Sequence, residues 1–262
     1  MNKIVLEKNS ITEKKLDDSI ILKLEENKVL DVKTLNINII KDTDLKIIQR
    51  SKEKIKLDII ININKNVKCN LLECKENGNY KESYKYNLEE SSHINIIKIN
   101  DVKKIKELNI FNLNGKHAKV NYIVKTIAKD EEKYDVLVYH NKGNTESNII
   151  NHGVNIKNGK IKFDVSGFVP NKITDCILNQ NNQIINLTNN KCEIKPNLFI
   201  DENDVIANHS AHIGKCDENK LFYLKSRGIT EKNAESLIIK GFLNSKIEEK
   251  DIMEKLINKY WR

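Results

Sequence analysis

Isoleucine at every second position is the feature that most constrains how this chain can fold. Ile55, Leu57, Ile59, Ile61 and Ile63 are separated mostly by polar residues. This period-two alternation is typical of a strand with one buried face, and the branched isoleucine side chain suits a pleated surface. The alternation extends from about residue 30 to residue 206 and is clearest in 35–39, 94–96, 108–110, 120–125, 134–140, 154–156 and 160–165. It predicts a mainly β protein.

The turn signals leave two β architectures open. Asn77-Gly78, Asn114-Gly115 and Asn158-Gly159 are tight-turn dipeptides, and the last one, between two alternating segments, favours an antiparallel hairpin. Nine Gly and two Pro are few for so much strand, so Asn is expected at many left-handed positions. A stack of parallel coils, with isoleucine inside and asparagine at the corners, is the alternative to a sandwich. No strict short repeat separates the two.

The pattern changes after His209 and predicts a small helical subdomain. A helix is expected over 220–227, closed by Gly228, and Thr230 is placed to cap a second one. The capping box in 245–248 predicts a third. One more helix is expected over 12–26. The predicted organisation is an N-terminal segment at 1–28, a β core at 29–208 and a helical subdomain at 209–262.

Composition restricts the class of protein. The chain has 262 residues, 39% of them hydrophobic, which is enough for a continuous core. There is no apolar run long enough for a membrane span, and a charge comes too early for a signal peptide. Five cysteines do not suggest a disulfide framework, so a reducing cytoplasm is expected. The net charge is +8, but the basic residues are scattered among 37 acidic ones and aromatics are 6%, which disfavours nucleic-acid binding.

Common catalytic signatures are missing from the sequence. It has no phosphate-binding loop, no G-x-G-x-x-G, no G-x-S-x-G, no H-E-x-x-H and no C-x-x-C. One group of soft and imidazole donors stands near the junction of the two regions: Cys176, Cys192, His209, His212 and Cys216. Such donors suit iron, zinc or copper(I). The alternative interpretation is that these histidines satisfy hydrogen bonds at a domain joint.

A longer run in the C-terminal third resembles the signature of the SufB/SufD family. It covers roughly residues 190–243 and comprises 195–205, His209-Ser210-Ala211, Gly214, 221–229, Ala234 and Gly241-Phe242. Upstream, Phe163 to Pro170 and Thr174-Asp175-Cys176 stand where that family has its last β-helix turns. The resemblance implies a right-handed parallel β-helix core with a small C-terminal α-helical subdomain, and it outweighs the hairpin signal.

The resemblance also implies a function and a set of residues. It implies a non-catalytic scaffold subunit of the SUF iron–sulfur cluster assembly complex, with ATP hydrolysis in a partner. Ser210 stands where a SufB-type chain has Glu, which points to a SufD-like chain. The chain is also shorter at its N-terminus than typical members of the family. His209 and Cys176 are then the expected metal and cluster ligands. The expected ATPase contacts are Leu221, Phe222, Tyr223, Arg227, Gly228 and Phe242.

Expected partners and cofactors follow from the same resemblance. The partners are a SufC-type ATPase and a SufB-like subunit or a second copy of this chain, with neither nucleic acid nor membrane. A transient iron–sulfur cluster forms at a subunit interface, and none is bound tightly by the isolated chain. Two other classes stay open: a β-helix enzyme acting on polysaccharide, which needs clustered carboxylates on successive coils, and a basic nucleic-acid module.

Overall fold

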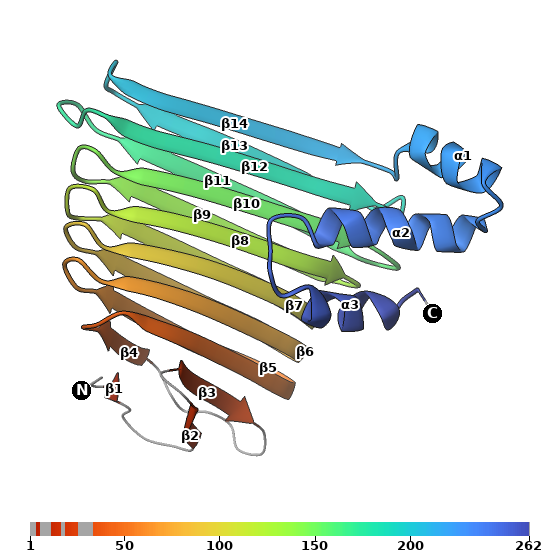
Figure 1. Cartoon of the computed structure of the whole chain (residues 1–262), viewed down its shortest axis with the longest axis horizontal. Coiled ribbons are helices and arrows are strands. Elements are labelled where there is room, and N and C mark those ends of the chain that lie inside the picture. Colours follow the sequence, from red (N-terminus) through yellow and green to blue (C-terminus); the bar gives the residue numbers. More distant parts are fainter. Residues whose placement is uncertain (1–3, 6–11, 17–18, 26–33, 262) are drawn as a thin grey trace.

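The computed structural model describes residues 4–5, 12–16, 19–25 and 34–261 and consists of a long coil of strands followed by three helices (Figure 1). Fourteen strands and three helices lie within these residues. They are β1 (Ile4–Val5), β2 (Thr12–Leu16), β3 (Ser19–Glu25), β4 (Thr34–Ile39), β5 (Thr43–Ile63), β6 (Lys68–Leu88), β7 (His93–Leu113), β8 (Lys119–Ala128), β9 (Glu131–His140), β10 (Glu146–Asn155), β11 (Lys160–Val169), β12 (Cys176–Asn186), β13 (Glu193–Ile200), β14 (Val205–Gly214), α1 (Glu218–Ser226), α2 (Glu231–Leu243) and α3 (Lys250–Asn258).

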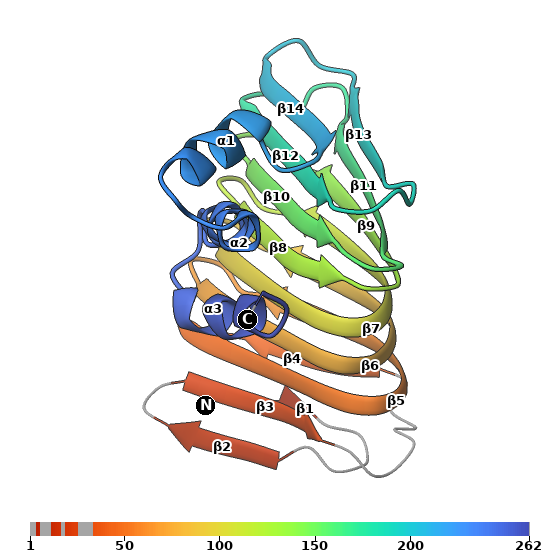
Figure 2. The same ribbon diagram turned by 90° about the vertical axis from the view of Figure 1, so that its right-hand side faces the viewer.

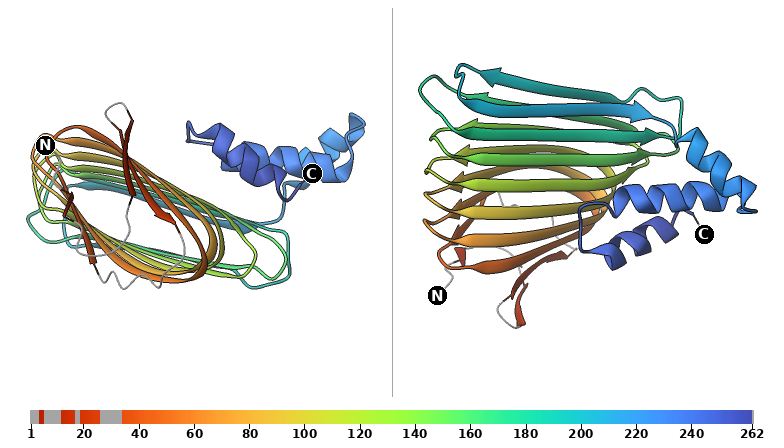
Figure 3. Two further views of the ribbon diagram at one scale, coloured as in Figure 1. Left: turned by 90° about the horizontal axis from the view of Figure 1, so that it is seen from below. Right: turned by 45° about the horizontal axis from the view of Figure 1, so that its top comes forward.

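The strands wind into a flattened parallel β-helix of about seven turns, and its oval section is visible from below (Figure 3, left). One wall, the front sheet, contains the first halves of β5, β6 and β7, then β8, β10, β12 and β14. The opposite wall, the back sheet, contains their second halves, then β9, β11 and β13. All of these pairings are parallel. The β-helix expectation is therefore confirmed.

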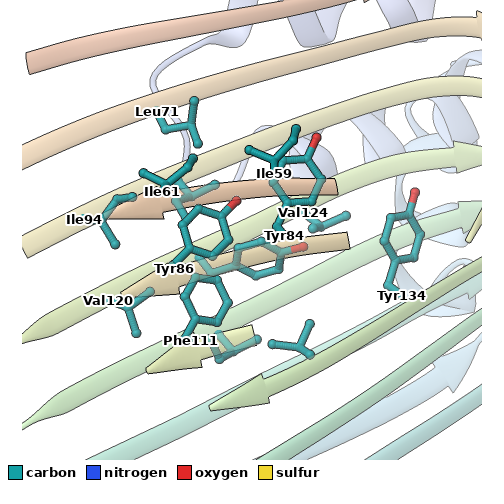
Figure 4. Close-up of a cluster of buried hydrophobic side chains, with 14 of the residues drawn as sticks. Ile59, Ile61, Leu71, Tyr84, Tyr86, Ile94, Phe111, Val120, Val124 and Tyr134 are labelled. Atoms are coloured by element: carbon teal, nitrogen blue, oxygen red, sulfur yellow. The ribbon is translucent and has the colours of Figure 1, made fainter. Parts of the chain in front are cut away.

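The core fills the space between the two sheets. Inward residues of successive coils stack on one another, so that Tyr86 lies 4.6 Å from Phe111 between ring centroids and the rings are parallel. Tyr84 and Tyr122 extend this aromatic column on either side, among isoleucine and valine from both walls (Figure 4). Burying this apolar surface is the main force that holds the coil together.

Helices α2 and α3 pack against the outside of the front sheet (Figure 2), while α1 packs on α2 and lies beyond the ends of the strands (Figure 1). Met253, Leu256 and Ile257 of α3 and Ile239 of α2 are buried there against outward residues of β6, β7, β8 and β10. Thr230 caps α2, as the sequence predicts, and Asp217 caps α1. The front sheet is thus buried on both faces over part of its width.

Two local predictions were wrong, and one predicted boundary lies at a different residue. The segments 12–16 and 19–25 are strands, not a helix, because β3 pairs in parallel with residues 44–50 of β5; the rest of 1–28 lies largely outside the described residues. The capping box at 245–248 does not form, since α3 begins at Lys250 and Ser245 instead donates to the carbonyl of Phe242. The last strand continues to Gly214, beyond the predicted core boundary at 208.

The hairpin expected at Asn158-Gly159 is also wrong. β10 pairs with β8 and β12 in one wall, while β11 pairs with β9 and β13 in the other. The turn therefore joins the two walls of one coil. Gly159 is needed there because a Cβ would lie 2.5 Å from the carbonyl oxygen of Ala128. Among the described residues, asparagine supplies three of the nine left-handed non-glycine positions: Asn66, Asn77 and Asn144.

None of the helices in the described part of the chain has the length and apolarity that crossing a membrane requires.

Candidate functional site at the last coil

His209 lies on the last strand of the front sheet, at the open end of the β-helix. Its register partner is Gln180 of β12, which in turn pairs with Ile149 of β10. His209 thus ends a column of inward-facing residues, but no described strand follows β14, so its side chain is exposed. Gln180 is buried and donates to the carbonyl of Asn197 on the opposite wall. The end of an otherwise apolar column is therefore polar.

The predicted donor group is not brought together. Cys176 pairs with Val205, four residues before His209 along β14, which separates the two by about 13 Å at strand spacing. His212 lies three residues beyond His209 on the same strand, so the two imidazoles point to opposite faces of the sheet. No group of three or more His, Cys, Asp or Glu able to hold a metal occurs within the residues described.

The remaining cysteines lie apart from His209. Cys192 precedes β13 and packs against the main core, where burial raises the pKa of its thiol. Cys216 is buried beneath the helices, and burial raises its pKa to about 11. Both are therefore protonated at neutral pH and poor ligands as they stand. Of the predicted donors, the two histidines of β14 are exposed, and His209 is the one that ends the inward-facing column.

Cys176 belongs to a buried polar chain in the interior. Its thiol lies 3.3 Å from the hydroxyl of Thr145, which is 2.7 Å from Nδ1 of His140. Nε2 of His140 lies 2.9 Å from the hydroxyl of Ser147. Burial lowers the pKa of His140 to about 4, so this imidazole is neutral at physiological pH. The contacts explain how a thiol and an imidazole are accommodated inside the coil.

A groove of about 1170 Å³ runs along the outside of the front sheet and ends at Asn208 and Ser210 of β14. Its floor carries a ladder of hydrogen-bonded asparagine amides, one from each coil, with neighbouring amides 2.8 to 3.2 Å apart: Asn70, Asn95, Asn121, Asn148, Asn179 and Asn208. The segment between α2 and α3, residues 246–249, forms one rim. The groove leads from the lower coils to β14, where Asn208 and Ser210 face it, while the side chain of His209 between them points to the opposite face of the sheet.

An interior polar band, defined as Glu73, Lys75, Glu82, Lys98 and Glu107, is a feature that sequence analysis missed. All five side chains are fully buried between the walls. Lys98 Nζ lies 2.8 Å from Glu107 and 3.0 Å from Glu73, and Lys75 Nζ lies 2.7 Å from Glu82. These charges occupy inward positions of the alternation, which is the signal that could have revealed them.

Burial and the neighbouring charges act in opposite directions on the carboxyl groups of the band. Burial opposes ionisation of Glu107, but Lys75 and Lys98 outweigh it and lower its pKa to about 2. Burial raises the pKa of Glu82 against the pull of Lys75. Tyr84 adds a hydrogen bond to Glu73 and lies under Lys98, whose Nζ is 3.4 Å from the ring centroid. Two lysines thus face three carboxylates, and Glu82 is the one whose ionisation burial opposes most effectively.

The predicted ATPase contacts divide into exposed and packed residues. Phe222 is 75% exposed and Tyr223 57% exposed on α1, and the guanidinium of Arg227 lies 5.3 Å from the Tyr223 ring centroid. Leu221 instead packs into the subdomain core. Gly228 has a φ of +82°, which lets the chain turn after α1.

Phe242 faces the β-helix rather than the solvent side of the helices. Its ring stacks on the imidazole of His152 with the ring centroids 4.6 Å apart. Leu237 of α2, by contrast, is exposed like Phe222 and Tyr223. We call Phe222, Tyr223 and Leu237 the helical patch. It is an exposed apolar surface of the kind that marks a protein–protein contact.

The fold and site define a parallel β-helix protein with a helical C-terminal subdomain and an exposed histidine on its last coil. Residues 59–242 match the family model described as "SUF system FeS cluster assembly, SufBD core domain". The chain belongs to this SufB/SufD family of iron–sulfur cluster assembly proteins.

Curated relatives carry the same description. The chain is 31% identical over 154 residues to the iron–sulfur cluster assembly protein SufD of Bacillus subtilis (strain 168), covering 58% of this chain and 35% of that protein. It is 28% identical over 134 residues to the SufD protein of Escherichia coli (strain K12), covering 50% and 31%. The matched part thus spans about a third of the length of these relatives.

Proposed function

We propose that this chain is a SufD-like, non-catalytic scaffold subunit of a cytoplasmic SUF complex that assembles iron–sulfur clusters. Two curated relatives carry the name SufD, and Ser210 follows His209 where a SufB-type chain would have Glu. ATP hydrolysis belongs to a SufC-type partner. Family membership favours this role over the polysaccharide enzyme considered from sequence.

The observation that carries the proposal is the open last coil around His209. Strands β13 and β14 are each paired along one edge only among the described strands, and Phe199 and Ile206 on them are exposed. A SufB-like subunit, or a second copy of this chain, would satisfy these edges and cover the apolar side chains. His209 would then offer one imidazole nitrogen to the iron of a nascent cluster, with the other ligands supplied across the interface.

The helical patch is the proposed ATPase contact. Phe222 and Tyr223 come from α1, which buries none of its own residues. Packing within this chain therefore does not explain why these two large apolar side chains are there. The Arg227 guanidinium over Tyr223 adds a charge at the edge of an apolar surface, and aromatic and arginine side chains are enriched at interface hot spots.

The two surfaces are separable by experiment. Phe222→Asp should abolish co-purification of a SufC-type ATPase while leaving a SufB-like subunit bound. Ile206→Asp is the matched control and should have the opposite effect, because it places a charge at the last coil. Loss of both partners in either variant, with the circular dichroism spectrum unchanged, would contradict the assignment of two surfaces.

The ligand role of His209 needs its own test. In the assembled complex, His209→Ala should lower the iron and acid-labile sulfide content, while His212→Ala, on the other face of the same strand, should not. Equal content in the wild type and His209→Ala would remove His209 from the cluster site. Cys176→Ser tests the sequence prediction for Cys176, which lies buried about four strand residues from His209.

A further inference from the structure

Five lysines spaced 25 to 29 residues apart in sequence form a straight column on the outer face of the back sheet. Parallel register places Lys56 beside Lys81, Lys81 beside Lys106, Lys106 beside Lys133, and Lys133 beside Lys162. Neighbouring strands are about 4.8 Å apart, so the column is about 19 Å long. All five side chains point outward, because the residues on either side of each one are buried.

A second column two residues earlier on each strand strengthens the first. It contains Lys54, Asn79, Lys104, Glu131 and Lys160. The two columns lie about 7 Å apart at strand spacing. We call them together the lysine stripe: eight lysines and one glutamate on a band about 7 Å wide and 19 Å long.

Most of this positive charge is not neutralised. Lys104 pairs with Glu131 at 2.6 Å, Lys133 with Asp135 at 2.6 Å, and Lys162 with Glu193 at 3.4 Å and Asp164 at 3.6 Å. The other five lysines of the stripe form no ion pair with a carboxylate of the described chain. Like charges directly opposite each other on neighbouring strands destabilise a sheet.

The shape of the stripe limits the partner. On the side away from Lys54, the next outward column contains Asp58, Asp135 and Asp164. A planar anionic membrane would meet these carboxylates together with the lysines, whereas a chain lying along the stripe would avoid them. Lysine binds phosphate as a point charge. When lysines neutralise a backbone of repeating phosphates, they release the counterions condensed on it, and an acidic protein surface has fewer such counterions to release.

We propose that the lysine stripe binds a linear phosphate polymer, aligned with the axis of the β-helix. The shared chemistry is a chain of repeating phosphates, and the two sources are a single-stranded nucleic acid and inorganic polyphosphate. The stripe is on the opposite wall from the helical patch and the groove, so this binding is independent of the proposed scaffold role.

Fluorescence anisotropy with the full chain tests the proposal, using a labelled 20-nucleotide oligo-dT and a labelled polyphosphate of similar length. With about five phosphates contacted, raising salt from 50 to 200 mM should weaken oligo-dT binding roughly 100-fold. The triple variant Lys56→Gln, Lys81→Gln, Lys106→Gln should lose at least about tenfold in affinity at low salt. Binding of one probe alone would assign the source, and binding of both would support the phosphate backbone.

The matched control is Lys116→Gln, Lys142→Gln, Lys172→Gln, which removes the same charge from exposed lysines in the turns between coils. It should bind like the wild type. The proposal is overturned if the control loses as much affinity as the stripe variant, because net charge alone would then explain binding. It is equally overturned if poly-glutamate or vesicles containing phosphatidylserine bind as tightly as both phosphate polymers.

Discussion

The Nζ of Lys125 lies 2.8 Å from Nδ1 of His152, on neighbouring strands of the front sheet and beneath the end of α2. The hydroxyl of Ser245 lies 3.4 Å from the same Nζ and 3.3 Å from Nδ1, and Phe242 stacks on the imidazole. Burial lowers the pKa of Lys125 to about 7 and, with the charge of Lys125, that of His152 to about 3. The neutral imidazole of His152 thus accepts a hydrogen bond from Lys125, and its stacking on Phe242 joins the helices to the coil.

Lys125→Met should stabilise the protein more at pH 6 than at pH 9. The folded-state pKa of about 7 is below the ordinary value of 10.5, so the buried amine costs stability that grows as pH falls from 10.5 to 7 and then stays constant. The difference in stabilisation between the two pH values should be about 2–3 kcal/mol. Urea unfolding measures it. Lys116→Met, an exposed control, should show no pH-dependent gain; an equal gain for Lys125→Met at both pH values would contradict the argument.

Glu132→Gln should stabilise the protein at pH 8 and change little at pH 5. Glu132 is fully buried and accepts hydrogen bonds from Thr126 at 2.6 Å and Tyr134 at 2.9 Å, and burial raises its pKa to about 7. The unfolded carboxyl ionises near 4.5, so the folded state loses stability as pH rises from 4.5 to 7. The gain at pH 8 should be about 2–3 kcal/mol.

The control for this prediction is the neighbouring residue. Glu131 is exposed and pairs with Lys104 on the surface, so Glu131→Gln should shift the thermal unfolding midpoint little at either pH. A destabilised Glu132→Gln at pH 8 would show that the carboxylate, rather than its protonated form, is needed inside the back sheet.

Asn121→Ala should destabilise the coil by about 1–2 kcal/mol, because it interrupts the asparagine ladder from both sides. Its amide donates to Asn95 at 2.8 Å and its carbonyl oxygen accepts from Asn148 at 2.9 Å. Asn208→Ala, at the end of the ladder with a single bond to Asn179 at 3.2 Å, should cost less. Equal urea midpoints for the two variants would contradict the prediction, because breaking two ladder hydrogen bonds would then cost no more stability than breaking one.

Phe111→Ala should cost about 3–5 kcal/mol, since it removes the centre of the buried aromatic column. Phe111 is fully buried, with Tyr86 stacked on it and Tyr122 edge-on at 5.4 Å between ring centroids. Phe222→Ala removes the same atoms from an exposed ring and should cost less than about 0.5 kcal/mol. Calorimetric unfolding of the two variants compares them directly.

The candidate site was only partly predictable. The C-terminal run directed attention to His209 and to Phe222 and Tyr223, and the structure leaves all three exposed. Cys176 was grouped with His209 because both lie near the domain junction in sequence, but register separates them by four positions. His212 seemed close to His209 in sequence, yet strand geometry turns the two side chains to opposite faces.

The sequence by itself determined the strands of the coil and the helices after them, because alternation at period two and the cap at Thr230 act over a few neighbouring residues. It failed at 12–16 and 19–25, where pairing with β5 makes strands of a predicted helix. Only the tertiary structure decided which strand lies beside which. Parallel pairing joins residues about 25 positions apart, and no local preference sets that register. Register therefore created the lysine stripe, the asparagine ladder and the interior polar band from residues that look scattered along the chain.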